Sequence, residues 1–216
     1  MKLRKILLGA SLLVLGSTAA HAELFGLLNG RSANPGSSPD LSVEGGVVFG
    51  DFQNIGARVN YRLSPVMVLH GDVGMSEIGN YGADADGIAF GVGVFYFLDQ
   101  QRFLEAADVG VHASFHMATL DWDSGFGTSG DLDYSNLTVE ALVSSKEPIS
   151  ENGMHWYANA GIHRIAFDGG RGFDNSDMEI GFGGGVTMPY GPGEVYAGID
   201  IVEEMMFGGG FRYFLQ

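Results

Sequence analysis

From residue 41 to the end of the chain, apolar residues alternate with polar residues or glycine in ten successive segments of about ten residues each. Clusters of Gly, Asp, Asn, Ser and Pro separate these segments. In the segment 54–63, one face carries Ile55, Ala57, Val59, Tyr61 and Leu63. Because successive side chains of a β-strand point to opposite faces, a period of two predicts strands. The sequence therefore predicts an all-β fold of ten antiparallel strands.

The composition of the second face decides which all-β fold fits this alternation. A soluble sandwich or lipocalin-like barrel needs an outward face that is rich in charged and polar residues. Here the second face is rich in glycine, and Lys146 is the single lysine after residue 22. In a membrane, apolar side chains contact lipid and the lumen can be polar, provided that the sheet closes. We expect a closed antiparallel transmembrane β-barrel over 41–216, with eight strands as the alternative if the first hairpin lies outside it.

The first 22 residues have the parts of a secretory signal peptide. Basic residues precede an apolar run over 6–15, and Ala20-His21-Ala22 supplies a small-residue cleavage pattern. A membrane anchor is the alternative, but the apolar run is short for a transmembrane helix. Residues 23–40 are expected to form a periplasmic lead-in segment, in which the stretch LFGLL also suits a position inside the lumen.

Charge and the absence of cysteine exclude several classes of protein. The chain carries 11 Lys and Arg against 26 Asp and Glu, a net charge of −15, and removal of the basic signal peptide makes the charge more negative. Nucleic acid is therefore not an expected partner. The chain has no Cys, so neither disulfides nor thiol chemistry is available to it.

The chain ends on an alternating apolar stretch, GGGFRYFLQ, although chain ends are usually polar and frayed. Gly210, Phe211, Tyr213 and Leu215 resemble the C-terminal assembly signal of small bacterial outer-membrane barrels, the class of the OmpA transmembrane domain, OmpX and OmpW. Those barrels usually end on Phe, whereas Gln216 follows here. The resemblance implies location in the bacterial outer membrane, contact with its lipid and lipopolysaccharide, and recognition of the last strand by the barrel assembly machinery. We expect a monomer.

The polar face of the predicted strands carries charged and histidine side chains that would point into the lumen. Unpaired charges in a narrow lumen are costly, so we expect a polar network of paired side chains. The strands that carry Glu44, Arg58 and Arg212 would be consecutive around a closed barrel, which suits such pairing. The expected network consists of Glu44, Arg58, Arg62, His70, Asp72, Asp108, His112, His116, Glu140, His163, Glu179, Asp200 and Arg212.

The predicted function depends on how full this lumen is. A barrel of eight to ten strands is mostly filled by side chains. Glycines on the inner faces of 87–93 and 181–185 remove bulk, however, and leave space for a water path. We therefore predict a non-enzymatic, porin-like protein with a structural role or that of a narrow passive channel, without cofactor.

An enzymatic alternative comes from His112, Ser114 and Glu140, which share the lumen face. A Ser activated by His and oriented by a carboxylate is the arrangement of an acyl hydrolase. These residues are similar to outer-membrane lipid A deacylases, in which His-x-Ser on a strand lies near a Glu. The site of that family faces lipid, whereas parity here points all three residues inward.

A metal site is not predicted from the acidic stretch 121–133. This stretch begins like a calcium loop, with Asp121 and Asp123 two residues apart. Gly125 and Leu132 then stand where the EF-hand pattern requires oxygen ligands. We interpret the stretch as a solvated outer loop.

Overall fold

The computed structural model describes most of the region 41–216 and part of the lead-in. The described residues are 27, 31–34, 39–50, 52–80, 83–98, 107–123, 129–168, 174–202 and 204–215. The predicted signal peptide over 1–22 and its cleavage site lie outside the described residues. The described residues contain no helix that is long and apolar enough to cross a membrane.

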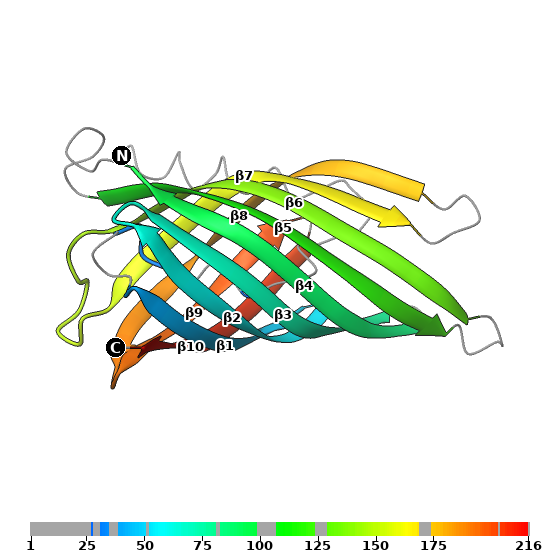
Figure 1. The fold of residues 1–216 in the computed structure, drawn as a ribbon, viewed down its shortest axis with the longest axis horizontal. Coiled ribbons are helices and arrows are strands. Elements are labelled where there is room, and N and C mark those ends of the chain that lie inside the picture. Colours follow the sequence, from blue (N-terminus) through cyan, green and yellow to red (C-terminus); the bar gives the residue numbers. More distant parts are fainter. Residues whose placement is uncertain are drawn as a thin grey trace, which may run out of the picture.

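Ten strands follow one another along the chain and wind around one barrel (Figure 1). All neighbouring strands are antiparallel, and β1 pairs with β10, so the sheet is closed. The predicted fold class is confirmed, and the eight-stranded alternative is wrong because the first hairpin is part of the barrel. The strands are β1 (Leu41–Phe49), β2 (Phe52–Ser64), β3 (Met67–Asn80), β4 (Ala83–Phe97), β5 (Ala107–Asp123), β6 (Ser129–Ser145), β7 (His155–Asp168), β8 (Asp174–Tyr190), β9 (Gly193–Val202) and β10 (Glu204–Leu215).

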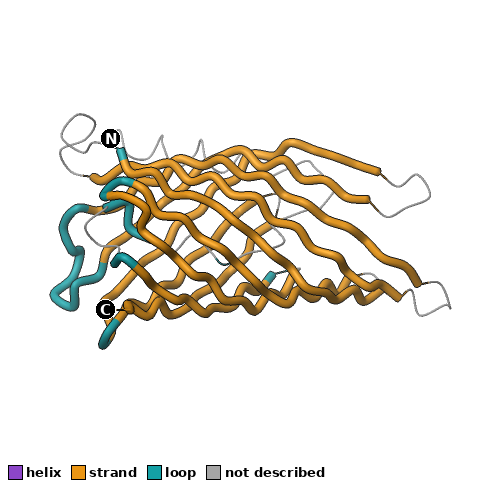
Figure 2. Tube along the Cα trace, viewed as in Figure 1, coloured by secondary structure: helices purple, strands orange, loops and turns teal. Residues whose placement is uncertain are grey.

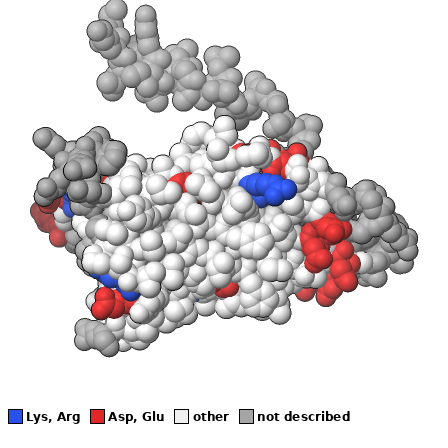
Figure 3. Space-filling view, turned by 45° about the horizontal axis from the view of Figure 1, so that its top comes forward, with Lys and Arg blue, Asp and Glu red and all other residues white. Residues whose placement is uncertain are grey.

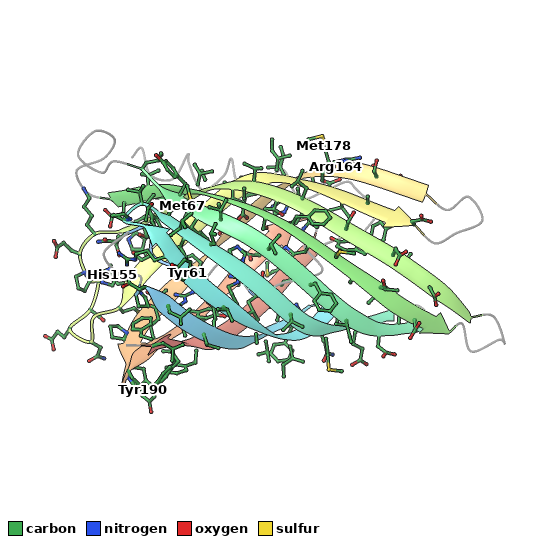
Figure 4. The ribbon with its side chains drawn as sticks, viewed as in Figure 1. Tyr61, Met67, His155, Arg164, Met178 and Tyr190 are labelled. Atoms are coloured by element: carbon green, nitrogen blue, oxygen red, sulfur yellow. The ribbon has the colours of Figure 1, made fainter. Side chains whose placement is uncertain are left out.

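Exposure alternates along the strands and separates an apolar outer face from the lumen. Ile55 and Val92 are each 61% exposed, whereas Arg58 is 1% exposed. The face seen in Figure 3 has few charged side chains along its middle, and acidic side chains gather towards one end. Figure 4 shows Arg164 and Met178 pointing away from the barrel. An outer face of this size and apolarity suits hydrocarbon better than water.

At one end of the barrel, which we call the higher end, some strands extend beyond their neighbours. The described turns and the C-terminal end of β10 lie together at the opposite end (Figure 2). There, Gly191 in the β8–β9 turn has φ 55°, a left-handed conformation that glycine adopts without strain. At the other end, Phe182 of β8 pairs with Ile201 of β9, and the earlier residues of β8 extend beyond that pairing. Exposed carboxylates lie at this higher end, on Glu77, Asp86, Asp121, Asp131 and Asp133.

Apolar side chains fill the lumen above and below a polar layer, which the sequence analysis did not predict. Along β6, Tyr134 belongs to one buried apolar cluster and Leu142 to another, and Asn136, Thr138 and Glu140 lie between them in the sequence. The first cluster comprises Val48, Ala85, Ala89, Ala118, Leu120, Tyr134, Ile165, Tyr196, Val202 and Met206. The second comprises Ala33, Val68, Phe95, Phe97, Leu142 and Tyr157. The interior is therefore a packed core.

The face assignment predicts a large difference in folding between a substitution on the outer face and one in the lumen. Val92→Arg places a charge on the exposed outer face, which costs about 2–4 kcal/mol near the middle of a bilayer. Ser114→Ala changes a buried inward side chain without adding charge or bulk. We expect Val92→Arg to reduce the folded yield in lipid vesicles strongly and Ser114→Ala to fold like the wild type, as measured by heat-modifiable migration on gels. Equal yields for both variants would contradict the assignment.

Candidate functional site

The polar network of the lumen is centred on Glu44 of β1, beside the seam where the sheet closes. Glu44 lies opposite Arg212 of β10 on one side and opposite Arg58 of β2 on the other. Arg212 Nε donates a hydrogen bond to Glu44 Oε2 at 2.9 Å, and Arg58 Nη1 lies 3.9 Å from Glu44 Oε1. Arg212 also contacts Glu194, its neighbour on β9. Two guanidinium groups thus neutralise a fully buried carboxylate.

Arg58 continues the network to β3 through a two-point contact with Asp72. Arg58 Nε donates to Asp72 Oδ1 at 2.5 Å, and Arg58 Nη2 donates to Asp72 Oδ2 at 3.2 Å. Paired contacts of this kind are among the strongest hydrogen bonds between side chains. Asp72 Oδ2 also lies 2.8 Å from His116 Nε2 and 3.2 Å from His70 Nδ1. Asp72 therefore connects β2, β3 and β5.

Histidines carry the network onward from β3 to β7. His70 Nε2 and His112 Nε2 are 3.0 Å apart, and His112 Nδ1 lies 3.1 Å from Glu140 Oε2. Asn159 Nδ2 donates to Glu140 Oε1 at 2.8 Å, and His163 Nε2 lies 3.8 Å from the same oxygen. One series of polar contacts consequently connects β9, β10, β1, β2, β3, β5, β6 and β7 across the interior.

Glycines of β4 and β8 make room for this network. A β-carbon on Gly91 of β4 would collide with the His116 ring, and one on Gly181 of β8 would collide with His163. The expectation that these glycine-rich faces leave a water path is therefore wrong at these positions. The space that the glycines release is filled by side chains from neighbouring strands.

Four of the predicted lumen residues do not take part in the contacts described above. Arg62 is paired with the exposed Asp40, at 3.8 Å between Nε and Oδ1. Asp108 is buried near the turn end of β5, Glu179 lies opposite His163 in the β7–β8 pairing, and Asp200 is buried on β9. The other nine predicted residues are brought together. Asn60 and Thr138 also take part, and their place on the polar face was the available signal for them. Asn159, which the alternation places on the lumen face as well, donates to Glu140.

Part of the lead-in segment enters the lumen and contacts the network. Leu27 is 6% exposed, and its carbonyl oxygen accepts from Arg58 Nη2 at 3.2 Å. Arg31 is 2% exposed and donates to Asn60 Oδ1 at 2.6 Å. The Ala33 amide donates to Ser144 Oγ at 2.8 Å. Leu27 is the one described residue of LFGLL and lies in the lumen, whereas the rest of that stretch lies outside the described residues.

Burial and neighbouring charges both act on the guanidinium of Arg31. Burial and the neighbouring Arg212 lower the pKa of the Arg31 guanidinium to about 9, and Glu44 opposes this effect. Arg31 was not predicted as a site residue because the lead-in has no period-two pattern that would assign it a face.

Ser114 is not joined to His112 in the manner of a hydrolase triad. His112 lies opposite Glu140 in the β5–β6 pairing and contacts its carboxylate, as an acyl hydrolase would require. The second ring nitrogen of His112 faces His70, however. The Ser114 hydroxyl has no hydrogen-bond partner among the described residues. The three residues thus form a His–Glu pair with a separate serine.

The described lumen offers little space for a ligand. A void between Leu27, Asp72 and His116 has a volume of about 10 Å³, at the lower limit for one water molecule. A larger hollow of about 1,030 Å³ is lined mostly by outward-facing side chains of β1 to β5, including Ile55 and Phe90. Among the described residues, no group of three or more His, Cys, Asp or Glu could hold a metal ion.

The strand pairing defines the class of protein as a closed ten-stranded antiparallel β-barrel. No family model matches the chain, and no curated protein matches it. Among solved structures, the chain is similar to the translocator domain of the autotransporter NalP from Neisseria meningitidis, with 12% identity, a TM-score of 0.48 and coverage of 82% of this chain and 89% of that one.

Two further solved structures show a similar degree of likeness. For the KdgM porin, the identity is 9% and the TM-score 0.40, with coverage of 81% of this chain and 99% of that one. For the N-terminal β-barrel domain of Pseudomonas aeruginosa OprF, the identity is 12% and the TM-score 0.39, with coverage of 80% and 96%. The fold assignment rests on the strand pairing, and these likenesses add no functional argument.

The network predicts that a buried arginine contributes far more to stability than an arginine at the rim. Arg58→Met keeps the bulk but leaves Asp72 and Glu44 short of a cation, and loss of one partner from a buried pair costs about 3–5 kcal/mol. Arg62→Met is the matched control, because its pairing with the exposed Asp40 is worth less than about 1 kcal/mol. Urea unfolding in lipid vesicles measures both free energies. Equal losses would show that the network does not stabilise the barrel.

Proposed function

We propose that the mature chain is an integral protein of the bacterial outer membrane with a structural, non-enzymatic role and a lumen that is closed at rest. The observation that carries this proposal is the packed interior, in which the network lies between two apolar clusters. A packed lumen suits a membrane scaffold and leaves little room for a solute. The narrow passive channel is the competing function, and it requires a continuous water path.

The outer face supports the proposed location. Large apolar side chains are exposed on the strands, and exposed carboxylates gather at the higher end of the wall. An apolar wall between polar ends matches the layers of a bilayer. Lipid and lipopolysaccharide are accordingly the proposed surroundings of the barrel. Because a closed sheet has no free edge that needs a partner, we propose that the protein works as a monomer.

The last strand supports recognition by the barrel assembly machinery. Tyr213 and Leu215 are exposed on the outer face of β10, and Phe211 shares their face. Gly210 lies on the inner face, where a β-carbon would approach the Tyr196 hydroxyl and the Gly45 carbonyl. A strand that pairs with β1 only when the barrel closes must be held until then. We propose that these four residues are the signal that is recognised.

The non-enzymatic role is supported by the surroundings of His112. Its two ring nitrogens face Glu140 and His70, so the ring has no nitrogen left to activate Ser114 in this arrangement. All three candidate residues are buried in the lumen. A lipid substrate would therefore need both a route into the interior and a rearrangement of the network.

Conductance distinguishes the closed barrel from the passive channel. Purified mature protein, with its folded state verified by heat-modifiable migration, is added to planar lipid bilayers under an applied voltage. We expect no steady unitary current, because packed side chains leave no continuous water path. An open porin in the same bilayers is the positive control. Reproducible current steps of one size would overturn the closed state and favour the channel.

A further inference from the structure

Arg31 is held in the lumen by contacts that suit a planar cation. Its Nη2 donates to Asn60 Oδ1 at 2.6 Å, and its Cζ lies 4.3 Å from the centroid of the Phe95 ring. Phe95 stacks in turn on His112, with the ring centroids 4.3 Å apart and the planes at 18°. A guanidinium can satisfy an acceptor at its edge and an aromatic ring at its face together, whereas an ammonium is a compact point charge.

The strands around Arg31 carry more carboxylates than arginines. In the connected network, β1, β3, β6 and β9 supply Glu44, Asp72, Glu140 and Glu194, and the strands supply Arg58 and Arg212 as cations. Arg31 and Glu194 line the same small void, together with Asn60 and Arg212. A cation at the position of Arg31 reduces this excess of carboxylates over arginines. The Glu194 carboxylate beside Arg31 favours a cation at this position, and the neighbouring Arg212 opposes it.

Arg31 belongs to the lead-in segment and not to a strand. Next to Arg31 in this segment, the Ala33 amide donates to Ser144 Oγ at 2.8 Å, and Ser32 Oγ lies 3.2 Å from the same atom. The segment therefore brings a guanidinium into the barrel as a group that is tethered outside the strands.

We propose that Asn60, Phe95 and Glu194 form a guanidinium-binding site in the lumen and that Arg31 is its tethered occupant. The site takes free guanidinium-bearing cations when Arg31 is absent. This inference goes beyond the structural role, and it holds whether or not the barrel conducts ions, since binding is measured separately from current.

Chemical rescue tests the site. Arg31→Ala removes the occupant and should lower the temperature at which the folded barrel converts to the unfolded gel form. Millimolar guanidinium chloride should restore most of this loss, and sodium chloride at the same concentration should not. Arg164→Ala is the matched control, because Arg164 lies on the outer face and offers no enclosed site. We expect guanidinium to leave the midpoint of that variant unchanged.

A second variant keeps the test decisive. The double variant Arg31→Ala with Asn60→Ala also lacks the Asn60 oxygen that accepts from the guanidinium. We expect rescue by guanidinium to be largely lost in it. If Arg31→Ala does not fold in sodium buffer, the same comparison is made on the folded yield, where guanidinium should raise the yield. An unchanged midpoint on removal of Arg31, equal rescue by sodium, or full rescue of the double variant would each overturn the site.

Discussion

Closure of the sheet through the pairing of β1 with β10 is the constraint on which the rest of the structure depends. In hydrocarbon, an unpaired backbone amide or carbonyl costs several kcal/mol, so a spanning sheet cannot keep free edges. The register of this pairing sets Leu41 opposite Leu215 and Glu44 opposite Arg212. The same strand sets Glu44 opposite Arg58 on its other side. The hydrogen bonds that remove the edges thus also assemble the charged centre of the lumen.

The inward positions of the closed barrel must then be filled. Outward positions are apolar because they face lipid, which leaves the inward positions to hold the polar groups. Arginine pairs with carboxylate, and histidines extend the contacts. Glycines on β4 and β8 leave space for the histidine rings. Apolar clusters cover this layer on both sides. Burial of charge is tolerated here because each group has partners, and removing one partner is costly.

Much of the fold could be predicted from the sequence, whereas the site could be predicted only in part. A period of two gives the face of each residue, so Arg58 and Val59 were correctly placed on opposite faces. It gives neither register nor the ends of the strands, so Leu120 near the end of β5 and Tyr134 near the start of β6 were not assigned to the lumen, and a water path along Gly91 was expected. Arg31 lies in a segment without periodicity. Parity placed Ser114 and His112 on the same face, but it does not give the orientation of the His112 ring. In the structure, His112 Nε2 faces His70.

The most direct test of a lipid-facing wall around a sealed interior uses adjacent cysteines. The chain has no Cys, so single substitutions report without background. Phe115 is 43% exposed on the outer face, and its neighbour Ser114 is 4% exposed in the lumen. In folded protein in vesicles, an apolar thiol reagent confined to the membrane should label Phe115→Cys, and neither it nor a small charged reagent should label Ser114→Cys. Labelling of position 114 by the membrane reagent, or by the charged reagent at the rate of unfolded protein, would contradict this account.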